Sequence, residues 1–190
     1  MAAVNMTEGG ITKHLVDYSI PLILGNMFQL TYNAVDSIIA GRFIGKEALA
    51  AEGTASPVMN IVILGISGIC MGASVLMSEF YGAGQKEKLK REMSTTVIFG
   101  CYFSVLIAIL GGLFSKSLLG VLGVPNEILG KAASYLSIIF LGVPFTYFYN
   151  AVSAALKSVG DSKTPLKFLA FSSILNAVLD LIFIGGMGRS

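Results

Sequence analysis

Charged residues are scarce in this sequence. Lys, Arg, Asp and Glu make up 13% of the 190 residues, about half their usual share in soluble proteins. Hydrophobic residues make up 54%, so the composition excludes a typical soluble domain and favours an integral membrane protein. The formal net charge is only +2, and no run of mixed basic and aromatic residues suggests a nucleic-acid partner.

Cysteine, histidine and tryptophan are also rare, with two, one and zero residues respectively. Cys70 and Cys101 lie inside apolar runs and form no CxxC or Cys/His pattern, which argues against a disulfide framework and against a zinc site. Without tryptophan, an aromatic belt at the membrane interface must use residues such as Tyr18 and Tyr81. The polar first ten residues precede an apolar run that is too long for the core of a signal peptide.

Five apolar runs are long enough to cross a bilayer, which takes about 20 residues. They cover residues 19–40, 56–80, 93–114, 129–156 and 165–185. No segment shows the alternation of an amphipathic strand, and only helices or closed barrels satisfy the backbone in lipid. The sequence therefore predicts an all-α integral membrane protein with five transmembrane helices.

Lysine and arginine gather in two of the four connections between these runs, at residues 86–91 and 157–167. The other two connections are poorer in basic residues and hold Arg42, Lys46, Lys116 and Lys131. Because positive charge marks the cytoplasmic side, we expect a multi-pass membrane protein with a cytoplasmic N-terminus. The fifth run then ends outside, where residues 185–188 look like the start of a further connection.

Two aspartates lie within the apolar runs, although a charge at the centre of a membrane helix costs about 2.5–3.5 kcal/mol on insertion scales. Asp36 ends a polar stripe at steps of three and four, and Asp180 ends a stripe with Ser172 and Asn176 at steps of four. The first stripe contains Asn26, Gln29, Tyr32 and Asn33. Asp36 precedes Gly41 by five residues and Asp180 precedes Gly185 by five, which places both carboxylates about 7 Å inside the outer boundary.

Two interpretations of these stripes compete. Polar side chains can hold membrane helices together. Alternatively, two acids at matched depth can share a cavity and bind a cation. Desolvation and mutual repulsion would then let the pair take up and release a proton, or the acids and asparagine oxygens would hold Na⁺.

Three stretches resemble the multidrug and toxic compound extrusion (MATE) transporters, in their bacterial DinF-like and NorM-like branch. They are LTYNAVDSIIAGRFIGKEALAA, MGASVLMSEFYGAGQKEK and AALKSVGDSKTPLKFLAFSSILNAVLDLIFIGG. The resemblance implies most of the amino-terminal six-helix lobe of a twelve-helix transporter. It also implies export of drugs and organic cations coupled to Na⁺ or H⁺, with no other cofactor and no enzymatic activity. The missing partners are the sixth helix and the carboxy-terminal lobe, without which we expect the chain to be inactive.

The same resemblance implies a cation site made by Asp36, Asn176 and Asp180. Tyr32 matches a tyrosine one turn before the first acid, and Tyr135 matches a tyrosine of the fourth helix. The stripe itself adds Asn33 as a supporting residue. A substrate pathway lined by polar and aromatic residues is a further hypothesis, with helix packing as its alternative, for Gln29, Tyr147, Tyr149 and Asn150.

Other functions remain open on the residues alone. A flippase for lipid-linked saccharides, from the same broader superfamily, would want a cationic central cavity, whereas the basic residues lie at helix ends. An intramembrane aspartyl protease also uses two membrane aspartates, but its GxGD motif is met only by Ser158-Val159-Gly160-Asp161, which lacks the first glycine. A purely structural membrane subunit would not need two matched acid stripes.

Overall fold

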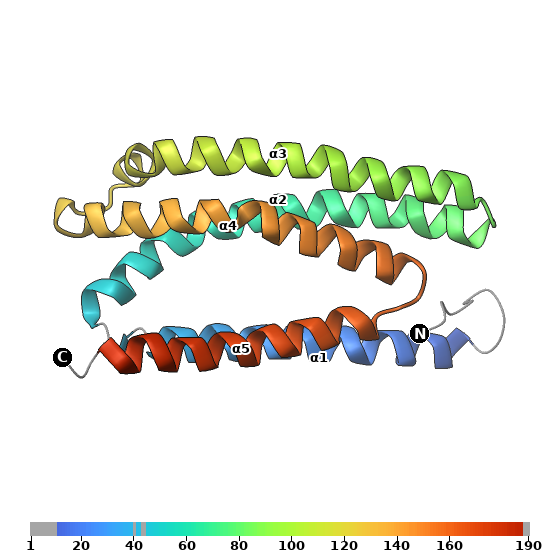
Figure 1. Ribbon diagram of the computed structural model, residues 1–190, viewed down its shortest axis with the longest axis horizontal. Coiled ribbons are helices and arrows are strands. Elements are labelled where there is room, and N and C mark those ends of the chain that lie inside the picture. Colours follow the sequence, from blue (N-terminus) through green and yellow to red (C-terminus); the bar gives the residue numbers. More distant parts are fainter. Residues whose placement is uncertain (1–10, 40, 43–44, 188–190) are drawn as a thin grey trace. The chain divides into compact units, whose positions relative to one another are not determined.

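The computed structural model describes residues 11–39, 41–42 and 45–187, apart from the side chains of residues 36, 47, 48, 181 and 183–187. Five helices follow one another along this part of the chain (Figure 1). Their bounds are α1 Ile11–Ile39, α2 Lys46–Gly82, α3 Lys86–Val121, α4 Asn126–Ser158 and α5 Lys163–Met187. The predicted all-helical fold is therefore confirmed, whereas the predicted end of the first run at residue 40, the first ten residues and Gly188 lie outside the described residues.

The helices are longer than the apolar runs within them. Residues 86–91 form the first turns of α3, and Lys163 and Lys167 lie in the first turns of α5. Lysine, arginine and glutamate are good helix formers, so a helix continues into the polar layer after its apolar run has ended. The basic clusters therefore belong to helix ends, and the orientation deduced from them stays a prediction.

Three helices are long and apolar enough to cross a membrane within the described residues: Leu49–Gly82, Lys86–Val121 and Asn126–Ser158. The remaining two, α1 and α5, carry the polar stripes. Asn26, Gln29 and Asn33 lower the mean hydropathy of α1, and most of the apolar last turns of α5 lie outside the side chains that the structure describes.

The chain divides into two compact units. The first contains α1, residues 156–162 and α5, and the second contains α2, α3 and α4 as far as Ala155. In the first unit α1 and α5 are in contact and run in the same direction, as Figure 1 shows by the colour change along each ribbon.

The corner between α4 and α5 is rigidly built in the first unit. Gly160, with φ of 86°, ends α4, and the N–H of Asp161 donates to the carbonyl of Leu156 at 2.9 Å. The Asp161 carboxylate then accepts the N–H groups of Lys163 and Thr164 at 3.1 and 2.9 Å, and the Thr164 hydroxyl at 2.6 Å. Partial burial alone would raise the pKa of Asp161, but these hydrogen bonds outweigh it and hold the pKa below its ordinary value.

A tyrosine of α1 is attached to the same corner. The Tyr18 hydroxyl donates to the carbonyl of Lys157 at 3.2 Å. Carbonyl groups in the last turn of a helix lack intrahelical donors, so this bond satisfies part of the α4 terminus. It also fixes the beginning of α1 beside the beginning of α5, and thereby helps to set how the two helices align.

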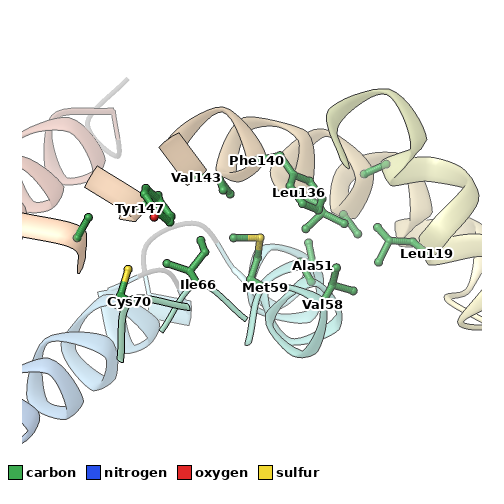
Figure 2. Close-up of a cluster of buried hydrophobic side chains, with 14 of the residues drawn as sticks. Ala51, Val58, Met59, Ile66, Cys70, Leu119, Leu136, Phe140, Val143 and Tyr147 are labelled. Carbon is green, nitrogen blue, oxygen red and sulfur yellow. The ribbon is translucent and has the colours of Figure 1, made fainter. Parts of the chain in front are cut away.

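The second unit has its own hydrophobic core, part of which is shown in Figure 2. Buried side chains of α2, including Val58, Met59 and Ile66, face Leu136, Phe140, Val143 and Tyr147 of α4, with Leu119 of α3 at one end. The three-residue connection at residues 83–85 joins α2 to α3 as antiparallel neighbours. Pro144 lies inside α4, which bends partway along its length (Figure 1).

Candidate cation site

The polar stripe on α5 contains two buried oxygen atoms that accept no hydrogen bond from the described part of the chain. The Asn176 Oδ1 and Asp180 Oδ2 atoms are both closed to solvent and have no hydrogen-bond partner among the described residues. Ser172, in contrast, satisfies itself within the helix, since its hydroxyl donates to the Leu169 carbonyl at 3.0 Å. An unsatisfied buried polar group costs about 1–3 kcal/mol, and more when it is charged. The stripe therefore carries an energetic cost at Asn176 and Asp180.

These two oxygens lie one helical turn apart and belong to one face of α5, because residues i and i+4 neighbour each other. One is a neutral amide acceptor and the other is an acidic oxygen. Hard cations such as Na⁺ and Ca²⁺ are bound by oxygens of this kind, and a proton on Asp180 would also remove the uncompensated charge. A cation at this point would satisfy the two oxygens that the described residues leave unpartnered.

The contact between α1 and α5 sets which residues of α1 lie opposite. A methyl group added at Gly25 would lie 3.7 Å from the terminal methyl carbons of both Leu166 and Leu169. From Gly25 to Asp36 is eleven residues, and from Leu169 to Asp180 is also eleven. Eleven residues make three turns and about 16 Å of rise, so in two parallel helices position 36 lies within about one turn of the level of position 180.

The same alignment pairs Tyr32 with Asn176, each seven residues beyond the contact. Tyr32 is half-buried and makes an interaction within the structure. Asn33, Gln29 and Asn26 are exposed along α1. The side chain of Asp36 lies outside the described residues, so its place opposite Asp180 follows from the backbone alone.

No basic residue occurs on α1 between Tyr18 and Ile39, or on α5 after Lys167. Lysine or arginine is the usual partner of a buried carboxylate. No lysine or arginine of α1 is therefore near enough to neutralise Asp36, and none of α5 is near enough to neutralise Asp180. The two stripes therefore contain no ion pair within α1 or within α5 at the level of the acids.

The other predicted residues lie on α4, in the second unit. Tyr135 is partly buried against the core and makes an interaction within the structure. Tyr147 is 1% exposed, and its hydroxyl donates to the Thr96 carbonyl at 2.7 Å. Tyr149 is exposed, and the Asn150 amide donates to the Thr146 carbonyl of its own helix at 2.8 Å. Tyr147 thus packs in the core, whereas a place for these residues in a substrate pathway stays a prediction.

Sequence reasoning missed Gly25, the residue of α1 that lies beside Leu166 and Leu169 of α5. The sequence does contain the relevant spacing: Gly25 lies eleven positions before Asp36, and Leu169 lies eleven positions before Asp180. It could not be used because nothing in a single sequence shows which pair of helices is in contact.

A protein-family model described as MatE matches residues 21–182. That match covers most of the chain, so the chain belongs to the MatE family, and the resemblance seen in the sequence is confirmed.

Named relatives agree with this family. The chain is 33% identical over 184 residues to the probable multidrug resistance protein YpnP of Bacillus subtilis (strain 168), covering 97% of this chain and 41% of YpnP. It is 34% identical over 170 residues to the probable multidrug resistance protein YoeA of the same organism, covering 90% and 37%. A FAD transporter of Shewanella oneidensis is 25% identical over 94% of this chain and 39% of its own length. The chain thus spans about two fifths of the length of these relatives.

Solved structures show the same fold. A MATE transporter crystallised in complex with MaD3S superposes with a TM-score of 0.91 at 29% identity, over 99% of this chain and 42% of that chain. A MOP-superfamily transporter from Pyrococcus furiosus, described as having a binding pocket of reversed polarity, gives the same TM-score and identity over 100% and 42%. All five helices, including α1 and α5, therefore have counterparts in solved MATE transporters.

Proposed function

We propose that this chain forms the amino-terminal part of a secondary multidrug antiporter of a bacterial cytoplasmic membrane. In this proposal, Na⁺ or H⁺ drives the export of organic cations and similar toxic compounds. The observation that carries it is the pair of buried, unpartnered oxygens on Asn176 and Asp180. The names of the multidrug relatives support the drug substrates.

The coupling cation would bind between α1 and α5. Asp180 and Asp36 would supply negative charge and Asn176 a neutral oxygen, while Tyr32 and Asn33 support the α1 side. Binding of the cation offsets the cost of the unsatisfied oxygens. Addition of the cation therefore shifts the protein towards the conformation that binds it more tightly. The size of this shift is set by the difference in cation affinity between the two conformations.

Such a difference is what an antiporter needs. If the drug-binding state of the protein holds the cation poorly, then cation entry displaces the drug, and the linkage is reciprocal. MATE-like transporters consist of two related lobes that alternate access around a midplane site. Export by this design requires the second lobe, so the 190-residue chain alone is proposed to bind the cation without exporting drugs.

An aspartyl protease is disfavoured by the state of Asp161. Both of its carboxylate oxygens accept hydrogen bonds from residues at the beginning of α5. This carboxylate caps the beginning of α5, and helix capping accounts for the acid of the GxGD-like sequence without a catalytic role.

Thermal unfolding of the purified chain in lipid nanodiscs tests the cation site. We expect the melting temperature to rise when Na⁺ replaces choline, because a ligand that binds only the folded state stabilises it. A proton-coupled site would instead show no Na⁺ effect but a pH-dependent melting temperature. Asp180→Asn should abolish a Na⁺ response, or the part of a pH response that persists in an Asp161→Asn background, and Asn176→Ala should weaken a Na⁺ response.

Two matched variants serve as controls. Asp17→Asn removes an exposed carboxylate of α1, and Asn150→Ala removes an amide that is satisfied within α4. Both should keep the wild-type response. A chain that responds to neither Na⁺ nor pH, or an Asp17→Asn variant that behaves like Asp180→Asn, would refute the cation site.

A further inference from the structure

Two glycines of α3 lie directly against aromatic rings of α4. A methyl group added at Gly100 would overlap the ring and hydroxyl of Tyr147, and one added at Gly111 would overlap the ring of Phe140. Both rings are buried, with 1% and 3% of their surface exposed. Each glycine therefore forms a socket that only the absence of a side chain keeps open, and we call these the Gly100 and Gly111 sockets.

Hydrogen bonds between the same two helices accompany the sockets. The Tyr147 hydroxyl donates to the Thr96 carbonyl at 2.7 Å, one turn of α3 before Gly100. The Ser137 hydroxyl donates to the Gly112 carbonyl at 3.1 Å, next to the Gly111 socket. Each socket thus combines a closely packed aromatic ring with a nearby hydrogen bond between the same two helices. Residue numbers rise along α3 as they fall along α4 from one contact to the other, as expected for antiparallel helices in one register.

The two sockets lie on opposite sides of Pro144. Phe140 precedes the proline by four residues and Tyr147 follows it by three. Proline cannot donate the hydrogen bond that would reach the carbonyl four residues earlier. The weakest point of the α4 backbone therefore falls between two positions at which α4 is held by α3.

We propose that α3 acts as a splint across Pro144, so that α4 keeps one fixed bend and the unit of α2, α3 and α4 moves as a single body. For α4 to swing at Pro144, at least one aromatic ring must leave its socket. Packed helices occupy discrete arrangements and do not deform continuously, so such a movement is an all-or-none event. Gly100 and Gly111 are therefore positioning residues, and Pro144 is a fixed bend without a hinge function. This inference does not depend on what the protein transports.

Spin labels on α4 measure the bend directly. Ile138 and Val152 are exposed on either side of Pro144 and lie roughly 21 Å apart along a helix, which suits electron–electron dipolar distance measurement. Nitroxide labels at these two positions in a chain with Cys70→Ala and Cys101→Ser should give one narrow distance distribution. Pro144→Ala should leave that distribution equally narrow, whereas Gly100→Ala should broaden it or add a second distance.

A thiol measurement gives an independent readout. The Cys70 thiol of α2 is 3% exposed and lies in the same buried cluster as Tyr147. In a Cys101→Ser chain, displacement of Tyr147 by Gly100→Ala should speed alkylation of Cys70 by N-ethylmaleimide about 5- to 30-fold, the change in an opening equilibrium that corresponds to about 1–2 kcal/mol of overpacking.

Gly112→Ala is the matched control, because a methyl group there meets nothing within 4 Å. It should change the alkylation rate less than about twofold, since no packing is disturbed. The pair Gly111→Ala with Phe140→Ala should label no faster than Phe140→Ala alone, because the added methyl group then has no ring to displace. This comparison remains valid if a single socket variant folds poorly.

Several results would overturn the splint. A wild-type chain with two label distances that Pro144→Ala reduces to one would show a working hinge. Equal alkylation rates for Gly100→Ala and Gly112→Ala would show that the sockets do not hold α4. Additive effects of Gly111→Ala and Phe140→Ala would show that the two residues do not share a contact.

Discussion

Gly25 of α1 lies beside Leu166 and Leu169 of α5, about three helical turns before the level of Asp36 and Asp180. Two parallel helices that touch at one level stay aligned over the following turns, provided that neither is displaced at the contact. The closeness of that contact therefore controls how near the two acidic positions approach. It links a packing feature in the first half of α1 to the proposed chemistry at its other end.

Substitution at Gly25 tests this link. Gly25→Ala should be tolerated, because the added methyl group would make ordinary contacts at 3.7 Å with Leu166 and Leu169. Gly25→Leu overfills the contact and should cost about 1–3 kcal/mol of stability. It should also weaken the melting response to Na⁺ or pH in nanodiscs. Gly68→Leu is the control, since Gly68 is exposed with nothing within 4 Å, and a matching loss there would contradict the alignment.

The two acids should act as one unit in a full-length transporter that contains these five helices. Asp36→Asn and Asp180→Asn keep the size of each side chain but remove its titratable charge. Each should abolish ion-coupled efflux of a fluorescent organic cation while leaving membrane insertion intact. Residues that share one site are non-additive, so the double variant should be little worse than either single one. Normal efflux from either variant, or additive losses, would return both residues to a role in helix packing.

Tyr32→Phe separates the hydroxyl of Tyr32 from its ring. The ring of Tyr32 lies on α1 at the level of Asn176, so a hydroxyl that supports the cation should be needed for full affinity. We expect the Na⁺ or pH response of the chain to weaken in Tyr32→Phe while the melting temperature without the cation stays close to that of wild type. An unchanged response would limit Tyr32 to a packing role.

The number and order of helices could be read from hydropathy, because each spanning segment must be about 20 apolar residues long. The helix ends could not be read from hydropathy. Residues 86–91 are helical because Lys, Glu and Arg have a high helix propensity, although most of them are not apolar. The α5 half of the site was visible as the spacing of Ser172, Asn176 and Asp180. The role of Tyr147 was not, because its packing depends on Gly100, which is 47 residues away in the sequence and on another helix.

The orientation of the helices can be tested with single cysteines. If residues 86–91 and 163–167 face the cytoplasm, a cysteine placed at Lys88 or Lys163 should resist impermeant thiol reagents in intact cells and react in permeabilised cells. Both side chains are near helix beginnings, and Lys163 is exposed. A cysteine at Leu122, just beyond α3 and exposed, should react in intact cells. The opposite pattern would invert the topology.

The cap at the beginning of α5 gives the protein a stability that depends on pH. Because hydrogen bonds hold the pKa of Asp161 below its ordinary value of 3.8 in the folded state, the folded protein binds this proton less readily than the unfolded chain. The stabilisation is therefore complete at neutral pH and is lost as the pH falls from about 4 through the lower folded-state pKa.

Asp161→Ala should cost about 0.5–2 kcal/mol at pH 7, as loss of a helix cap does, and should flatten the melting temperature between pH 5 and 3 relative to wild type. Asp161→Asn can retain the bonds from Lys163 and Thr164 without a titrating group, so it should flatten the same pH dependence at a smaller cost. Asp17→Asn, which removes an exposed acid of the same unit, should leave the wild-type profile in place. If Asp161→Ala and Asp17→Asn gave the same profile, the carboxylate of Asp161 would not be what fixes the corner between α4 and α5.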